Sequence, residues 1–119
     1  MKDSNLIERA AQWAEKRGFK KIKVNCEGYE TPTQYTNQEE GEPFIPDVTG
    51  MQLGGKSFVE IATKTDDEQR RISKWKLLST LANMKGGKLF LLAPKGHKSF
   101  TEGIVKKHHL NAQVVYLKS

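Results

Sequence analysis

The stretch that decides the fold is PDVTGMQLGGKSFVEIATK, residues 46–64. Two β-rich segments, at 44–53 and 56–64, flank a Gly-Gly pair. Adjacent glycines readily adopt the positive φ angles that a tight turn between antiparallel strands requires. The stretch therefore predicts a β-hairpin with Gly54 and Gly55 as its two turn residues.

The same stretch contains GMQLGGKS (50–57), which satisfies the phosphate-loop pattern GxxxxGK[ST]. In a nucleotide-binding protein the residues after the Lys-Ser pair form a helix whose N-terminus holds the phosphates. Here the pair is followed by FVEIATK, whose β-branched and aromatic residues predict a strand. We therefore interpret the match as accidental and keep nucleotide binding only as a third alternative.

A hairpin determines which side chains face one another. With the two glycines in the turn, Asp47 is expected to oppose Ala62 on the neighbouring strand. Side chains two residues apart on a strand share a face, so Glu60 and Lys64 are expected diagonally across from Asp47. Two carboxylates and an ammonium group so placed can bind a divalent cation and neutralise a phosphate. The pattern thus indicates metal-dependent phosphodiester hydrolysis.

The rest of the chain predicts one α/β domain that spans residues 1–119, with a mixed central sheet flanked by helices. Apolar periodicity predicts the further elements, which are helices at about 4–17, 66–85 and 99–107 and strands at 19–25, 88–94 and 112–117. The polar, turn-rich segment 28–43 is expected to be a loop or hairpin tip. The expected order is αβββαβ, followed by a C-terminal αβ extension.

Charge is distributed unevenly along the chain. The net charge is +6, yet no Lys or Arg lies between Lys23 and Lys56, and the six acids of that segment are Glu27, Glu30, Glu39, Glu40, Glu42 and Asp47. The remainder carries +12, because 20 basic residues accompany the 8 other acids. A basic surface favours a polyanion, and an acidic segment within it is suited to a divalent cation, although a solvated acidic loop is the alternative.

The compartment expected from the sequence is the cytoplasm. No apolar run approaches the length of a bilayer span, and the N-terminal residues lack the apolar core of a signal peptide. The single cysteine, Cys26, cannot form a disulfide within the chain, which fits a reducing compartment.

The residues Pro46 and Asp47, then Glu60 on the next strand, then a lysine, in an αβββαβ order, resemble the PD-(D/E)xK nuclease superfamily, the restriction-endonuclease-like fold. The resemblance implies that Asp47 and Glu60 bind Mg²⁺ or Mn²⁺ and that the lysine is catalytic. The family places this lysine two residues after the acid, where this chain has Ala62, and Lys64 follows two residues later. The alternative is a catalytically degenerate nuclease-fold module that binds nucleic acid or a protein.

The resemblance also implies further site residues. The first helix in that family often contributes an acid, for which Glu8 and Glu15 are the candidates, with two solvated glutamates as the alternative. On the second helix Arg70, Arg71 and Lys74 are candidates for contacts with phosphates, or else a solvated basic face. The expected partner is nucleic acid, DNA in the first place, although no residue distinguishes DNA from RNA. The sequence leaves open whether the domain forms a homodimer.

Overall fold

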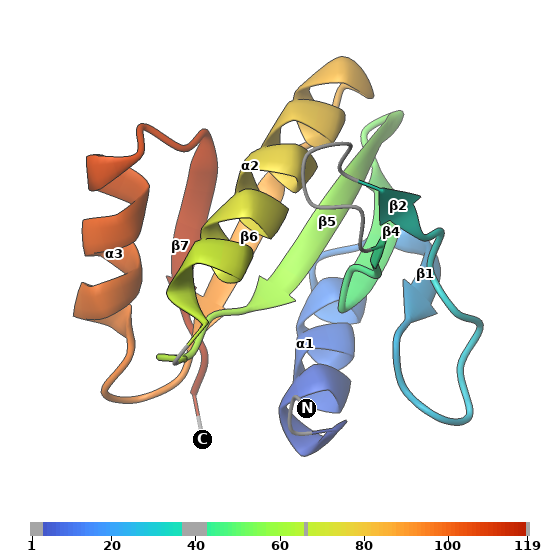
Figure 1. Ribbon diagram of the computed structural model, residues 1–119. Coiled ribbons are helices and arrows are strands. Elements are labelled where there is room, and N and C mark those ends of the chain that lie inside the picture. The colour runs from blue at the N-terminus through green and yellow to red at the C-terminus, as the bar shows by residue number, and fades with distance from the viewer. Residues whose placement is uncertain (1–3, 37–42, 66, 119) are drawn as a thin grey trace.

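The computed structural model describes residues 4–36, 43–65 and 67–118 and contains a mixed five-stranded sheet (Figure 1). In sheet order, its strands are β1 (Lys20–Val24), β4 (Val48–Gln52), β5 (Gly55–Ile61), β6 (Leu89–Ala93) and β7 (Ala112–Tyr116). The pairs β1–β4 and β4–β5 are antiparallel, whereas β5–β6 and β6–β7 are parallel. The prediction of an α/β chain with a mixed sheet is confirmed.

The described helices are α1 (Ser4–Lys16), α2 (Glu68–Met84) and α3 (Lys98–Lys107). Each parallel connection runs through a helix, α2 between β5 and β6 and α3 between β6 and β7. A short antiparallel ribbon of β2 (Tyr35–Thr36) and β3 (Pro43–Phe44) lies where the expected loop or hairpin tip (28–43) meets the expected strand (44–53), which begins only at Val48. None of the described helices is both long enough and apolar enough to span a bilayer.

Alternating side chains divide the core into two clusters, one on each face of the sheet. Val48, Val59 and Phe90 pack in the cluster that contains α1. Phe58 and Leu91 pack in the cluster that contains α2 and α3. The sheet therefore lies between α1 on one face and α2 with α3 on the other (Figure 1).

The predicted hairpin is present, but the prediction of its turn residues was wrong by one position. Gln52 pairs with Gly55, so the turn residues are Leu53 and Gly54, which have φ angles of 52° and 83°. Gly55 serves another purpose, because a Cβ atom there would lie 2.1 Å from the carbonyl oxygen of Gly86, in the α2–β6 turn. The glycine that the sequence offers to the turn is thus required by tertiary packing.

The residues that match the phosphate-loop pattern belong to the hairpin and not to a loop that leads into a helix. Lys56 and Ser57 lie inside β5, where Ser57 pairs with Gly50. The Ser57 hydroxyl accepts a hydrogen bond from the backbone N–H of Lys88 at 3.1 Å. A strand, rather than a helix, follows the Lys-Ser pair, as predicted.

Two sequence expectations concern residues outside the described ranges. The acids Glu39, Glu40 and Glu42 lie there, as does Asp66, at which the second helix was expected to begin. Within the described residues, α2 begins at Glu68, and the Asp67 side chain accepts a hydrogen bond from the backbone N–H of Arg70 at 3.3 Å.

Candidate functional site

Asp47 and Glu60 lie opposite one another on neighbouring chain segments. The β4–β5 ladder ends at the pair Val48↔Val59, so the residues that come next on the two sides are Asp47 and Glu60, and not Asp47 and the predicted Ala62. The predicted register was wrong by two residues. Because side-chain direction alternates with a period of two, this error leaves the two acids on the same face.

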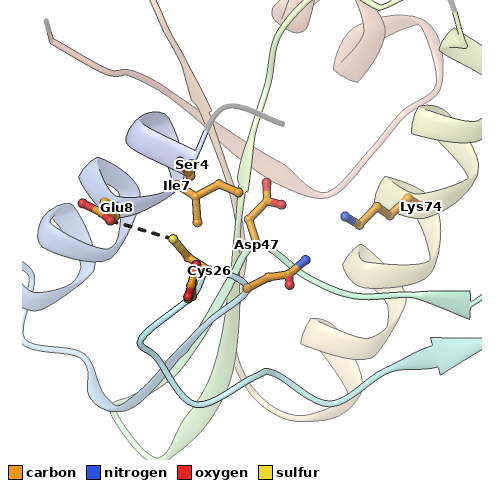
Figure 2. A pocket seen from close by; sticks show the side chains of 8 residues that line it. Ser4, Ile7, Glu8, Cys26, Asp47 and Lys74 are labelled. Carbon is orange, nitrogen blue, oxygen red and sulfur yellow. Dashed lines mark hydrogen bonds between the residues drawn. The ribbon is translucent and has the colours of Figure 1, made fainter. Parts of the chain in front are cut away.

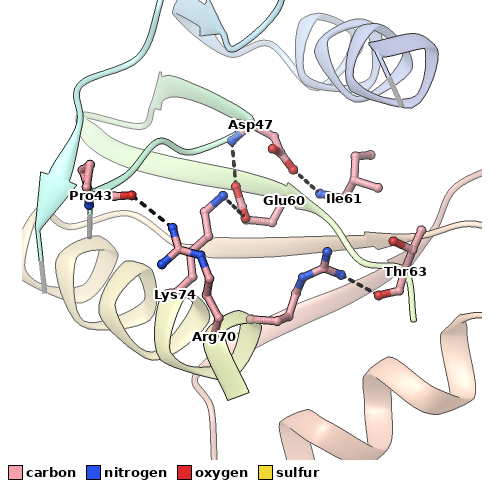
Figure 3. A network of polar contacts seen from close by, with 8 residues as sticks. Pro43, Asp47, Glu60, Ile61, Thr63, Arg70 and Lys74 are labelled. Carbon is pink, nitrogen blue, oxygen red and sulfur yellow. Dashed lines mark hydrogen bonds and ion pairs between the residues drawn. The ribbon is translucent and has the colours of Figure 1, made fainter. Parts of the chain in front are cut away.

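The two acids are buried and bonded reciprocally to each other's strand (Figure 3). Asp47 donates its backbone N–H to Oε2 of Glu60 at 2.7 Å. Ile61, the next residue on β5, donates its backbone N–H to Oδ2 of Asp47 at 2.8 Å. Asp47 is 2% exposed and Glu60 is 0% exposed, so these bonds offset part of the cost of burying the carboxylates.

The lysine that meets the acids comes from α2. Nζ of Lys74 lies 2.9 Å from Oε1 of Glu60 (Figure 3), and the Lys74 side chain is 14% exposed. A buried carboxylate requires a partner of opposite charge to remain ionised at low cost. Lys74 was predicted as a phosphate contact and not as a partner of Glu60. The sequence does contain a sign that Lys74 lies close to the core. It comes directly before Trp75 and four residues before Leu78, at the border of the buried face of α2.

Lys64, the lysine expected at the site, lies elsewhere. β5 ends at Ile61, so the expectation that residues 60, 62 and 64 continue along one strand face is wrong. The backbone N–H of Lys64 donates to Nδ1 of His97 at 3.0 Å, which ties the segment after the strand to the start of α3. Lys64 itself is exposed.

A cavity of about 730 Å³ opens beside Asp47. Figure 2 shows the Asp47 and Lys74 side chains directed into the space between α1 and α2. The other lining residues are Ser4, Ile7, Glu8, Asn25, Cys26 and Glu27, most of which no sequence pattern indicated. Polar and charged groups from α1, α2 and the segment after β1 therefore share one cavity.

The two acids predicted on α1 differ in position. Glu8 lines the cavity, where its Oε1 lies 3.8 Å from Sγ of Cys26 (Figure 2). Glu15 lies two helical turns further along α1 and is exposed. Of the two candidates, the structure brings Glu8 toward Asp47.

A second, smaller cavity of about 240 Å³ adjoins the first through Lys74, which lines both. Arg70 and Arg71, the other two candidates for phosphate contacts on this helix, also line it. Arg70 donates to the carbonyl oxygen of Pro43 at 3.3 Å and lies over the Phe44 ring, 4.6 Å from its centroid. Arg71 donates to the carbonyl oxygen of Thr63. Three cationic side chains therefore surround one cavity.

The carboxylate oxygens of Asp47 and Glu60 are of the chemical type that binds hard divalent cations. Carboxylate oxygens are the ligands that Mg²⁺ and Mn²⁺ prefer. Asp47 and Glu60 form a pair, and no group of three or more potential ligands among His, Cys, Asp and Glu occurs within the described ranges. Magnesium commonly takes one or two protein carboxylates and completes its coordination with water and substrate phosphate, so a pair fits this ion.

Comparisons of the chain with protein-family models, with curated proteins and with solved structures gave no significant match.

Proposed function

We propose that this chain is a nuclease-like domain of the restriction-endonuclease-like fold that hydrolyses phosphodiester bonds in nucleic acid with Mg²⁺ or Mn²⁺. The observation that carries the proposal is the contact between Asp47, directly before β4, and Glu60 on β5, with Lys74 2.9 Å from Glu60. The order α1, β1, β4, β5, α2, β6 supports it, because it follows the αβββαβ order of that fold.

In this proposal Asp47 and Glu60 hold the cation, which when bound supplies Lewis-acid activation of water and of the phosphate. The ammonium group of Lys74 replaces Lys64 as the cation that neutralises charge developing on the phosphate. Lys74 is suited to this role because it contacts Glu60 and also lines both cavities. Arg70 and Arg71 position the neighbouring phosphates of the substrate.

A second function is favoured by the hydrogen bonding of Glu60. Its two oxygens each meet a donor of the protein, Lys74 and the backbone N–H of Asp47. A carboxylate held this way can serve the fold alone, and the chain would then be a degenerate module that binds nucleic acid or a protein partner.

Binding of Mn²⁺ to the metal-free protein, followed by electron paramagnetic resonance, separates the two functions. If the chain is a nuclease, Mn²⁺ should bind saturably, Asp47→Asn should remove this binding, and cleavage of nucleic acid should depend on the metal. Nucleic-acid binding without Mn²⁺ binding would establish the degenerate module.

A further inference from the structure

The edge strand β1 is protected against pairing with another chain. Its register with β4 shifts between Lys20 and Lys23, and Lys21 has a φ angle of 51°. The backbone N–H of Val24 donates to the carbonyl oxygen of Glu30, in the loop that follows. Lysine side chains, a bulge and a covering loop are devices that prevent edge strands from associating.

The opposite edge strand, β7, differs in its residues and in its regularity. Its sequence AQVVY contains no charged residue, proline or glycine, and its five residues pair with β6 in an uninterrupted register. β7 is last in the strand order, so its outer side has no neighbouring strand among the described elements. An uncharged, regular edge strand is a template for a further strand.

The direction of the hydrogen bonds defines how a further strand would pair. Leu117 donates its N–H to the carbonyl oxygen of Ala93 and so faces inward, toward β6. Backbone groups alternate along a strand, which directs those of Ala112, Val114 and Tyr116 to the open side. In an antiparallel second copy centred on Val114, the two Val114 residues would face each other. The outward N–H and C=O groups of Ala112 would then meet those of Tyr116 in the second copy.

We propose that β7 is the interface of a homodimer, in which two copies pair antiparallel about a twofold axis at Val114 and form one continuous sheet. In this register Tyr116, which is 42% exposed, faces the small Ala112 of the second copy. Lys118 falls opposite Leu110, so lysine does not oppose lysine. The strand thus pairs a large side chain with a small one and sets no like charges against each other, which favours a second copy as the occupant.

The predicted dimer is weak, because an interface built on one five-residue strand is smaller than the interfaces of stable complexes. Sedimentation velocity across a concentration series should show a monomer that converts to a dimer. Tyr116→Lys should abolish the dimer, whereas Tyr29→Lys, at a tyrosine of similar exposure (44%), should not. A chain that stays monomeric throughout, or a dimer that survives Tyr116→Lys, would overturn the proposal.

Cross-linking tests the register. In a Cys26→Ser background, Val114→Cys should form an intermolecular disulfide under mild oxidation, since residues in a hydrogen-bonded antiparallel pair lie about 5.5 Å apart. Gln113→Cys is the control. In this register position 113 faces position 115 of the second copy, so the two introduced cysteines are displaced from each other along the strands. Equal cross-linking of both variants, or none of Val114→Cys, would contradict the twofold register. Neither experiment uses metal or nucleic acid, so the outcome is independent of nuclease function.

Discussion

The Nζ atom of Lys74 on α2 lies 2.9 Å from Oε1 of Glu60 on β5, and this ion pair joins the helix to the buried centre of the sheet. Removal of the ammonium group leaves a buried carboxylate without that charge partner. We expect Lys74→Ala to abolish cleavage and to lower the free energy of unfolding by about 3 kcal/mol. Lys64→Ala, at the exposed lysine that the sequence had indicated, should change stability by less than about 0.5 kcal/mol and leave cleavage intact.

Urea unfolding and cleavage assays measure the two effects. The double variant Glu60→Gln with Lys74→Met keeps an acceptor for the Asp47 N–H and removes both charges, so it should recover much of the lost stability without activity. Cleavage retained by Lys74→Ala and lost in Lys64→Ala would reverse the assignment of the lysine.

A metal-binding prediction concerns the carboxylate pair. Asp47→Asn and Glu60→Gln preserve the shape of each side chain but remove the negative charges that attract a divalent cation. Each should abolish saturable Mn²⁺ binding, as measured by electron paramagnetic resonance, and also cleavage. Glu15→Gln is the matched control, because Glu15 is exposed near the end of α1. Mn²⁺ binding unchanged in both site variants would place the ion elsewhere.

The predicted nucleic-acid contacts of Arg70 and Arg71 are expected to depend on salt. For duplex DNA each phosphate contact contributes about −0.9 to the slope of log K against log salt concentration. Arg70→Gln and Arg71→Gln should each make this slope shallower by about that amount. Lys106→Gln, at an exposed position on α3, is the control. Fluorescence anisotropy at several salt concentrations measures the slopes, and slopes equal to that of the parent chain would exclude these arginines from the interface.

The hairpin turn offers a stability prediction. Leu53 is fully exposed and has a φ angle of 52°, a left-handed conformation that costs a side chain such as leucine about 1–2 kcal/mol. Asn tolerates this conformation, and Asn-Gly is the preferred pair in such turns. Leu53→Asn should therefore raise the free energy of unfolding by about 1 kcal/mol. Gly54→Ala, at a φ angle of 83°, should lower it. Thermal unfolding of both variants measures the changes, and a loss of stability in Leu53→Asn would contradict the strained turn.

Two glycines are expected to respond in opposite directions to alanine. A Cβ atom at Gly87 would lie 1.8 Å from the carbonyl oxygen of Lys56, so Gly87→Ala must push the α2–β6 turn away from β5. We expect a loss of about 3 kcal/mol or more. Gly103 lies inside α3, where an added Cβ atom would meet no atom within 4 Å, so Gly103→Ala should stabilise the helix by about 1 kcal/mol. Denaturant unfolding compares the two, and equal effects would argue against the close contact.

The sequence by itself determined the class of fold, the hairpin and the shared face of Asp47 and Glu60. These follow from local rules, because strand and helix periodicities repeat over a few residues and side-chain direction alternates with a period of two. That periodicity is why an error of two residues in the register still left the acids together.

Only the tertiary structure decided which lysine meets the acids and which glycine forms the turn. Lys74 reaches Glu60 because α2 packs on that face of the sheet, and Gly55 is excluded from the turn because its backbone contacts Gly86. Both relationships join segments that are distant along the chain and depend on how a helix packs on a sheet. Local periodicity contains no information on that packing, whereas the folded chain sets it through the contacts of its buried side chains.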